Sequence, residues 1–389
     1  MRVFYIDDIP TPYRLSVFRK ITERYEGEFK IGFCADAEPG RTWELNFDEI
    51  NSECIKGFQW RPPFQINPFS IKINLSIISV LNTYKPDLVI MSGYTHPTIF
   101  LAVLYCWIRK IPFGIVSETN EHCSSISGIR WWIKKIVIYP IIHLMSFGLP
   151  TGSQAKDYFV KLGCKNIPYF YFPNTPDISP IKKARTNVGS SINKAYIKKK
   201  YGIDSEVPII LFVGRLILAK NPIELVSAFN NLNEISKEEA ILVIVGNGEQ
   251  ERVVQKAMEG NPNIKRIPWL DKPNEVYDLM SVADVFVLPS THEPWGAVVN
   301  EALAAGCCVV TSDKVGSSYD LIEDGISGFI YKSGEINQLI DILDILIKSK
   351  NTRIRISLEG QKSASKFDQD YVVDNFINVV SYIKNNVSK

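Results

Sequence analysis

The sequence has few of the residues that build metal sites and disulfide frameworks. It contains four histidines and seven cysteines in 389 residues, and no two cysteines form a C-x-x-C pair. An odd, dispersed set of cysteines in a long chain is typical of reduced thiols in the cytosol. The histidines also lie far apart, so no spacing resembles a metal site. We therefore expect a cytoplasmic protein that holds no metal.

Long hydrophobic runs are also missing. The longest, residues 136–149, is broken by Pro140 and His143, and it is shorter than the ~20 residues that a spanning helix needs. The N-terminus enters a strand pattern at once, without the form of a signal peptide. Residues 129–142 mix aromatic, cationic and aliphatic side chains. Two interpretations stay open for them: a core helix with exposed lysines, or peripheral contact with the inner face of a membrane.

Neither positive nor negative side chains are in clear excess. The formal net charge is +2, which is too small for a protein that binds nucleic acid through a general basic bias. Hydrophobic residues make up 46% and charged residues 22%, as in packed globular proteins. The length of 389 residues suits two domains better than one core.

Short apolar runs alternate with amphipathic segments along the whole chain, which predicts parallel sheets covered by helices. The pattern predicts strands at 3–7, 29–34, 88–92, 113–117, 146–151, 168–172, 209–213, 241–245, 265–268, 285–288, 309–311 and 328–331. It predicts helices at 13–25, 71–84, 97–108, 129–142, 153–162, 222–232, 250–258, 274–282, 297–305, 336–349 and 370–384.

A polar stretch rich in proline, asparagine and serine interrupts this alternation between residues 173 and 194. We therefore predict two Rossmann-like α/β domains with a linker between them. The predicted boundaries are an N-terminal domain at 1–180, a linker at 181–205, a C-terminal domain at 206–368 and a C-terminal helix at 369–389. Ligands of such sheets bind at the carboxyl ends of the strands.

The first informative motif follows the strand at 209–213. Gly214 ends the strand, Arg215 comes next, and Lys220 precedes Asn221 and Pro222. Asn221 is typical of a helix N-cap and Pro222 of a first helical position. A helix N-terminus beside two cations predicts a diphosphate site. Two solvated surface cations are the competing interpretation.

The second motif follows the strand at 285–288. Glu293 lies in the loop, Gly296 opens the next helix, and Glu301 lies inside that helix among apolar neighbours. A carboxylate accepts hydrogen bonds from two adjacent hydroxyls. The pair therefore predicts recognition of two diols, such as a ribose and a hexose. An exposed helical position fits Glu301 poorly, because its neighbours are apolar.

Taken together, these segments resemble the retaining glycosyltransferases of family 4, which have the GT-B fold. The resemblance covers most of the chain and is strongest between residues 213 and 331. It rests on Gly214-Arg215 with Lys220, Val245-Gly246-Asn247-Gly248, Glu293 and Glu301 around Trp295-Gly296, and Asp324-Gly325 with Gly328-Phe329.

The resemblance implies a role for each matching residue. Arg215 and Lys220 would bind the donor diphosphate in place of a metal, Glu301 the ribose and Glu293 the sugar. Further donor contacts would come from the following residues: Gly214, Gly246, Trp269, Leu270, Trp295, Gly296, Ala297 and Val298. The resemblance also implies an acceptor-binding N-terminal domain and a nucleotide-sugar-binding C-terminal domain that face a cleft. It implies as well a C-terminal helix that returns to the N-terminal domain.

The N-terminal half departs from the family pattern. Relatives carry paired glycines in the first loop, where this chain has Asp7-Asp8 followed by Arg14. Arg14 is either a substitute anion contact or a solvated arginine at a helix start, and we expect the solvated arginine. Relatives also place a histidine near the sugar. The matching stretch offers Glu118, which we take as a catalytic candidate, and His122 as the alternative.

The sequence thus predicts a metal-independent hexosyltransferase. It would move a sugar from a nucleoside-diphosphate sugar, which is a substrate and not a cofactor, to a glycan or lipid-linked acceptor. A nucleotide-sugar epimerase and a non-catalytic sugar-nucleotide-binding protein are the alternatives. A dehydrogenase is disfavoured, because Gly246-Asn247-Gly248 lacks the third glycine of a dinucleotide motif.

Overall fold

The computed structural model describes residues 1–37, 45–60, 70–122, 128–188, 191–203, 206–236 and 239–386. The chain divides into two compact units. The first comprises Met1–Asn174 with Gln369–Lys389, and the second comprises Thr175–Asp368. Each is described by itself.

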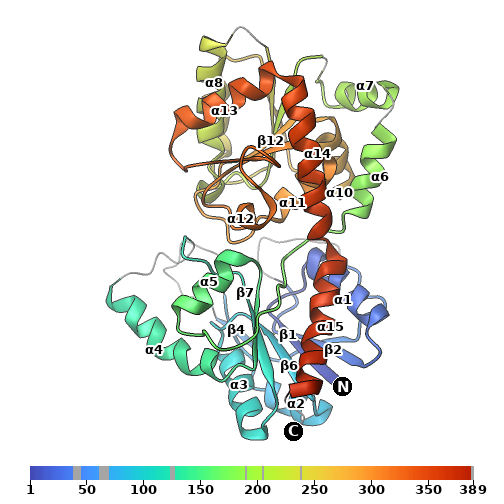
Figure 1. Ribbon diagram of the computed structural model, residues 1–389, viewed down its shortest axis with the longest axis vertical. Helices are drawn as coiled ribbons and strands as arrows, with labels where there is room; N and C mark the ends of the chain where they lie inside the picture. Colours follow the sequence, from blue (N-terminus) through green and yellow to red (C-terminus); the bar gives the residue numbers. More distant parts are fainter. Residues whose placement is uncertain are drawn as a thin grey trace. The chain divides into compact units, whose positions relative to one another are not determined.

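The first unit is a parallel sheet in the strand order β3-β2-β1-β6-β7-β8, with helices on its faces (Figure 1). Its strands are β1 (Arg2–Asp7), β2 (Glu28–Phe33), β3 (Ser52–Cys54), β6 (Leu88–Ser92), β7 (Phe113–Ser117) and β8 (Phe147–Pro150). A separate antiparallel pair is formed by β4 (Phe58–Trp60) and β5 (Ile71–Ile73). Its helices are α1 (Pro12–Arg24), α2 (Ile77–Tyr84), α3 (Pro97–Arg109), α4 (Ile129–His143), α5 (Ser153–Lys161) and α15 (Gln369–Asn386).

The C-terminal helix α15 completes the core of the first unit, as predicted. It lies beside α1 (Figure 1), where Asp370 pairs with Lys20 at 3.2 Å. Phe376 of α15 packs edge-on against Phe29 of β2, with ring centroids 5.2 Å apart. Burial of such an aromatic ring contributes about 1.5–3 kcal/mol. The helix is therefore part of the hydrophobic core of this unit.

The second unit is a parallel sheet in the order β11-β10-β9-β12-β13-β14. Its strands are β9 (Ile209–Val213), β10 (Ile241–Val245), β11 (Ile264–Ile267), β12 (Val285–Leu288), β13 (Cys308–Ser312) and β14 (Phe329–Tyr331). Its helices are α6 (Ser179–Val188), α7 (Ser191–Lys200), the short 3₁₀ helix η1 (Leu218–Lys220), α8 (Pro222–Ile235), α9 (Glu251–Met258), α10 (Pro273–Val282), α11 (Ala297–Ala305), α12 (Ser318–Leu321), α13 (Ile336–Lys348) and α14 (Lys350–Lys366).

Three predictions of local structure are wrong. The described part of the predicted linker, 181–205, is largely helical. In α6, Ile181 is buried and the Arg185 guanidinium donates to the Ala305 carbonyl at 3.0 Å. The predicted helix at 71–84 begins only at Ile77, because Ile71–Ile73 pairs as a strand. The predicted strand at 168–172 follows β8 but forms only an isolated bridge at Tyr169.

Candidate functional site

The order of the strands selects one edge of the second sheet for a ligand. From β9 the chain moves outward to β10 and β11, and then returns to β12 on the other side of β9. In parallel α/β sheets, ligands bind outside the carboxyl ends of the two strands at such a reversal. The loops after β9 and β12 carry Arg215, Lys220 and Glu293. The residues chosen from the sequence thus lie at the expected edge.

Two glycine loops meet at this edge. The Leu216 amide donates to the Asn247 carbonyl at 2.8 Å, and the Gly214 amide donates to the Val245 carbonyl at 3.1 Å. A Cβ atom on Gly246 would lie 1.9 Å from the Gly214 carbonyl oxygen, and the φ of Gly246 is +146°. Only glycine tolerates both constraints. The close contact fixes the backbone that presents Arg215, whose side chain is exposed.

Lys220 and Glu293 form an ion pair across the reversal point. The Lys220 ammonium, at the end of η1, donates to the Glu293 carboxylate in the loop after β12. Their side chains are only 18% and 13% exposed. The family resemblance assigned Lys220 to the donor diphosphate and Glu293 to the sugar, whereas the structure brings the two side chains into direct contact. Removing only one partner of such a mostly buried ion pair is costly, because the other charge is left without compensation.

The loop that carries Glu293 is held by backbone hydrogen bonds on both sides. The Thr291 amide donates to the Ala219 carbonyl at 2.9 Å, next to Lys220. On the other side, the Gly316 amide donates to the Glu293 carbonyl at 3.0 Å. These bonds fix the backbone at Glu293, whose side chain contacts Lys220.

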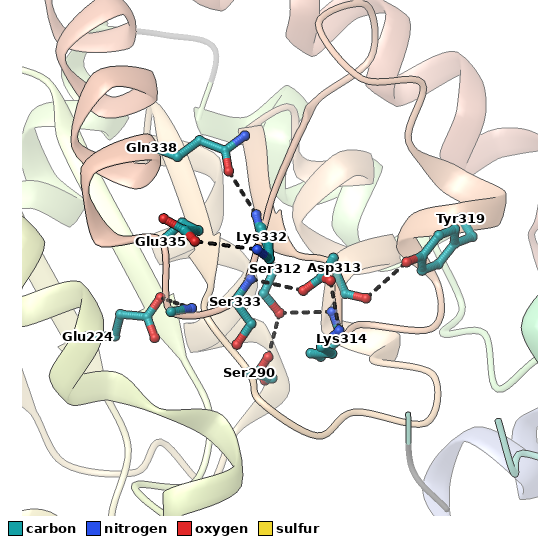
Figure 2. A network of polar contacts seen from close by, with 11 residues as sticks. Glu224, Ser290, Ser312, Asp313, Lys314, Tyr319, Lys332, Ser333, Glu335 and Gln338 are labelled. Atoms are coloured by element: carbon teal, nitrogen blue, oxygen red, sulfur yellow. Dashed lines mark hydrogen bonds and ion pairs between the residues drawn. The ribbon is translucent and has the colours of Figure 1, made fainter. Parts of the chain in front are cut away.

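A polar network supports the loop after β13 (Figure 2). The Asp313 carboxylate accepts from the Ser333 amide at 2.9 Å and from the Lys314 ammonium at 2.7 Å. The Asp313 carbonyl accepts from the Tyr319 hydroxyl at 3.0 Å. The Lys314 carbonyl in turn accepts from the Glu293 amide at 3.3 Å. Sequence reasoning missed these residues, although Asp313-Lys314 directly follows a buried strand.

Helix α11 begins at the same edge and carries the second glutamate. Gly296 precedes it with a φ of +92°, and a Cβ atom there would lie 3.1 Å from Glu293 Cγ. Glu301 is buried, at 6% exposure, so the exposed alternative is excluded. The Trp295 ring is also buried in the core. A ligand would therefore contact the Trp295 backbone and the half-buried Ala297 and Val298 rather than the Trp295 ring.

The loop after β11, which carries the predicted donor contacts Trp269 and Leu270, is built around Asn247. Its side-chain oxygen accepts from the Trp269 amide at 3.2 Å and from the Arg266 guanidinium at 3.0 Å. Arg266 also pairs with Glu251 at 2.8 Å. The Trp269 ring is exposed and Leu270 half-buried. Arg266 was not predicted, because a charge at the end of a strand has no distinctive pattern.

The polar residues at two helix starts differ in their outcome. Asn221 is the N-cap residue of α8 and Pro222 its first residue, as predicted, although Asn221 has a left-handed backbone and makes no side-chain capping bond. Its amide donates instead to the Glu224 carboxylate. Arg14 is buried rather than solvated, with its guanidinium 4.8 Å from the centre of the Phe172 ring. A cation–π contact and burial thus replace solvation.

The N-terminal candidates belong to the first unit. Glu118 follows β7 and is exposed, and its carboxylate accepts from the Asn174 amide. His122 is half-buried. Among the residues that the structure describes, no group of histidine, cysteine, aspartate or glutamate side chains is arranged to hold a metal ion. None of the helices in the described ranges combines the length and apolar content that a membrane span requires.

Residues 193–363 match the family model described as glycosyl transferases group 1. Sulfoquinovosyl transferase SQD2 of Arabidopsis thaliana is 27% identical over 315 residues, or 79% of this chain and 59% of the relative. UDP-Gal:alpha-D-GlcNAc-diphosphoundecaprenol alpha-1,3-galactosyltransferase of Escherichia coli is 28% identical over 200 residues. These residues are 48% of this chain and 51% of the relative. The matched regions thus span little more than half the length of these curated relatives.

Among solved structures, HepE of Anabaena in complex with UDP is similar over 98% of this chain and 100% of that chain. The TM-score is 0.76 at 18% sequence identity. This likeness confirms the predicted fold of two Rossmann-like domains.

Proposed function

Because residues 193–363 match the family model described as glycosyl transferases group 1, we propose that this chain is a retaining, metal-independent glycosyltransferase. It would move a sugar from a nucleoside-diphosphate sugar to a glycan or lipid-linked acceptor. The observation that carries the proposal is the Lys220–Glu293 pair at the reversal point of the second sheet, with Arg215 and Glu301 on the adjoining elements.

Each of these groups suits one part of a nucleotide sugar. As the glycosidic bond breaks, negative charge builds on the departing diphosphate, and fixed cations such as Lys220 and Arg215 lower that barrier. Glu293 and Glu301 would accept hydrogen bonds from the hydroxyls of the sugar and the ribose. The N-terminus of α11 adds free backbone amides that favour an anion. Glu118 is the proposed contact from the first unit.

The test is a thermal-shift screen of nucleotide sugars, followed by measurement of released nucleoside diphosphate with and without EDTA. A transferase releases diphosphate from one of the sugars, and the rate survives the chelator. An epimerase would change the sugar while it stays attached to the nucleotide. A non-catalytic binding protein would show a thermal shift without release. Loss of release with EDTA, restored by Mg²⁺, would contradict metal independence.

We also propose that the protein acts in the cytoplasm and touches the inner face of a membrane through residues 129–142. Trp132, Ile136 and Tyr139 of α4 are all exposed and lie at helical spacing. The name of the Escherichia coli relative describes a lipid-diphosphate acceptor. Cosedimentation with phosphatidylglycerol vesicles should fall in the Trp132→Ser/Ile136→Ser variant. Exposed Leu358 of α14 supplies a matched control, Leu358→Ser.

A further inference from the structure

Glu224 connects the loop that carries Lys220 to the last strand of the second sheet. It lies in the first turn of α8, three positions after Asn221. Its Oε2 accepts from the Asn221 side-chain amide, and its Oε1 accepts from the Tyr331 hydroxyl at 2.9 Å and the Gly334 amide at 3.4 Å. Tyr331 ends β14, and Gly334 lies in the turn before α13, which Glu224 faces in Figure 2. None of these four groups has been assigned to the donor.

Asn221, the residue after Lys220, holds an uncommon backbone conformation. Its φ and ψ are both +48°, in the left-handed region. Asparagine enters this region more readily than most residues, because its short side chain can hydrogen-bond locally. The Asn221 backbone amide donates to the Leu218 carbonyl at 3.1 Å and closes η1, while its side chain donates to Glu224. The conformation of the chain beside Lys220 is therefore supported by the Glu224 carboxylate.

The spacing of Asn221 and Glu224 resembles a helix capping box, but the bonds are different. In a capping box, the N-cap side chain accepts from the backbone amide of the third helical residue, whose carboxylate accepts from the N-cap backbone amide. Here the Asn221 side chain is a donor and makes no capping bond. Its backbone amide is used within η1, so Glu224 binds the side chain instead. Helix capping therefore does not account for this contact.

The other end of the link is fixed in the core. Tyr331 is fully buried. Burial, and then the negative charge of Glu224, raise the pKa of the Tyr331 hydroxyl, so this hydroxyl keeps its proton and donates. A carboxylate only accepts hydrogen bonds, through about four lone-pair sites, so Glu224 can hold Tyr331, Gly334 and Asn221 at once. An amide at this position would turn one of the two acceptors into a donor.

Lys220 is thus supported in two ways. Its ammonium contacts Glu293, and its backbone is tied through Asn221 to Glu224. A diphosphate that bound the ammonium would weaken the contact with Glu293. The tie through Asn221 involves no group assigned to a ligand, so it would persist and keep Lys220 in place while the donor is bound.

We propose that Glu224 is a positioning residue that acts on Lys220 through Asn221. It holds the loop from which the Lys220 ammonium reaches the departing diphosphate. The inference rests on the proposed transferase function and adds a residue that acts on its site from outside. A cation that is already in place where charge develops lowers the barrier without reorganisation. Loss of Glu224 should therefore lower the rate more than the affinity for the donor.

The competing explanation is that Glu224 only fastens the turn before α13 to α8. A swap of the two hydrogen-bonding groups separates the explanations. Asn221→Asp places two carboxylates against each other, and Glu224→Gln places two amides there. The double variant Asn221→Asp/Glu224→Gln restores one donor and one acceptor at the wild-type net charge, so the link is reversed but present. If Glu224 only fastens the turn, Glu224→Gln and the double variant should behave alike.

The position of Lys220 can be measured without any nucleotide. Acetic anhydride acetylates accessible, unprotonated lysine side chains, and mass spectrometry of the treated full chain gives the relative rate at each lysine. A Lys220 released from its mostly buried ion pair should react faster. We expect about a tenfold higher rate at Lys220 in each single variant, the effect of losing one hydrogen bond to a charged group. The double variant should return to the wild-type rate.

Two controls make this result specific. Lys200 pairs with Glu275 at 2.8 Å in the same unit, and its acetylation rate should not change in any variant. Glu335→Gln alters a carboxylate in the same turn that pairs with Lys332 instead, and Lys220 should react there as in the wild type. A Lys220 rate that stays at the wild-type level in both single variants, or stays raised in the double variant, would overturn the proposal.

The effect on the reaction is measured as nucleoside diphosphate released by hydrolysis of the nucleotide sugar with the largest thermal shift. In Glu224→Gln, kcat should fall about tenfold while KM changes less, because the fixed cation acts mainly in the transition state. In a Lys220→Ala background the same substitution should cause no further fall. An equal fall there, or an unchanged kcat in the single variant, would overturn the positioning role.

The two measurements keep this inference apart from the proposed function. If the wild-type protein releases no diphosphate from any nucleotide sugar, the transferase function fails. The acetylation rates would then still decide whether Glu224 positions Lys220. Normal release together with unchanged acetylation in the single variants would leave the transferase function standing and overturn this inference alone.

Discussion

The Lys220 ammonium and the Glu293 carboxylate are in direct contact at the carboxyl ends of β9 and β12, and both side chains are mostly buried. A diphosphate that reached Lys220 would compete with Glu293 for the same cation. Donor binding and the position of Glu293 are therefore coupled. The pair is expected to change partners as a nucleotide sugar binds.

The first prediction concerns Glu293→Gln, which keeps the shape of the side chain and removes its charge. Affinity for the nucleoside diphosphate should be unchanged or higher, because Lys220 loses a competing anion. Transfer should fall, because the hydrogen bond to the sugar is weakened. Calorimetry with the diphosphate and a turnover assay measure the two effects. A loss of diphosphate affinity greater than about tenfold, or ~1.4 kcal/mol, would contradict the competition.

The second prediction concerns Lys220→Ala. Turnover should fall about 10²-fold or more, the usual effect of losing one charged contact to a transition state. Affinity for the nucleotide sugar should fall less. The control is Lys332→Ala in the same unit, because Lys332 pairs with Glu335 at 3.4 Å while remaining exposed. Near-normal turnover in Lys220→Ala would remove this residue from the mechanism.

The third prediction concerns Glu301→Ala. If the buried carboxylate holds the ribose, the variant should bind the nucleoside diphosphate more weakly by about 1.5–3 kcal/mol. Calorimetry tests this directly. The companion variant Glu293→Ala should lower transfer and leave this binding nearly unchanged. Equal losses of diphosphate binding in both would show that the two roles are wrongly assigned.

The fourth prediction concerns the contact between the two glycine loops. Gly246→Ala would place a methyl group 1.9 Å from a backbone carbonyl that cannot move aside. The variant should be markedly destabilised and should lose donor binding. Gly260→Ala is the control, because that glycine also has a positive φ, of +83°, but its Cβ would meet no atom within 4 Å. It should cost only about 1–2 kcal/mol, the usual cost of a left-handed backbone for an L-residue. Similar melting temperatures for the two variants would refute the explanation.

The fifth prediction concerns pH. Burial raises the pKa of Asp7 from 3.8 to about 6, although the nearby Arg14 lowers it. The folded-state pKa is thus above the unfolded value, so the folded state loses stability as the pH rises from about 4 through about 6. Asp7→Asn should remove roughly 2–3 kcal/mol of this loss. Thermal unfolding should show a higher melting temperature for the variant at pH 8 and little difference below pH 4.

The sequence predicted most of the fold because buried parallel strands are short apolar runs. The strand Ile241–Val245 and the helix Ala297–Ala305 were placed at their observed bounds. Helix α14 (Lys350–Lys366) was missed, because it packs through small residues rather than an apolar stripe. A Cβ atom on Gly360 would lie 2.7 Å from Leu303 Cδ2. This packing cannot be read from hydrophobic periodicity.

The candidate site was predicted in part. Gly214, Lys220 and Glu293 could be found because they follow strands in a recognisable order. Arg266 could not, because it is a single charged residue whose only signal is the partner that it meets. That partner is Asn247, 19 positions away in the chain. Such contacts follow from tertiary structure rather than from local pattern.

Helix α15 has a consequence for the order of folding. The first unit needs Gln369–Asn386, which leave the ribosome only after every residue of the second unit. Thr175–Asp368 is continuous and can reach its native state during synthesis. Residues 1–174 are made earlier, but their face beside α1 stays uncovered until α15 is available. During translation, that face is exposed to chaperones until Gln369–Asn386 have also been made.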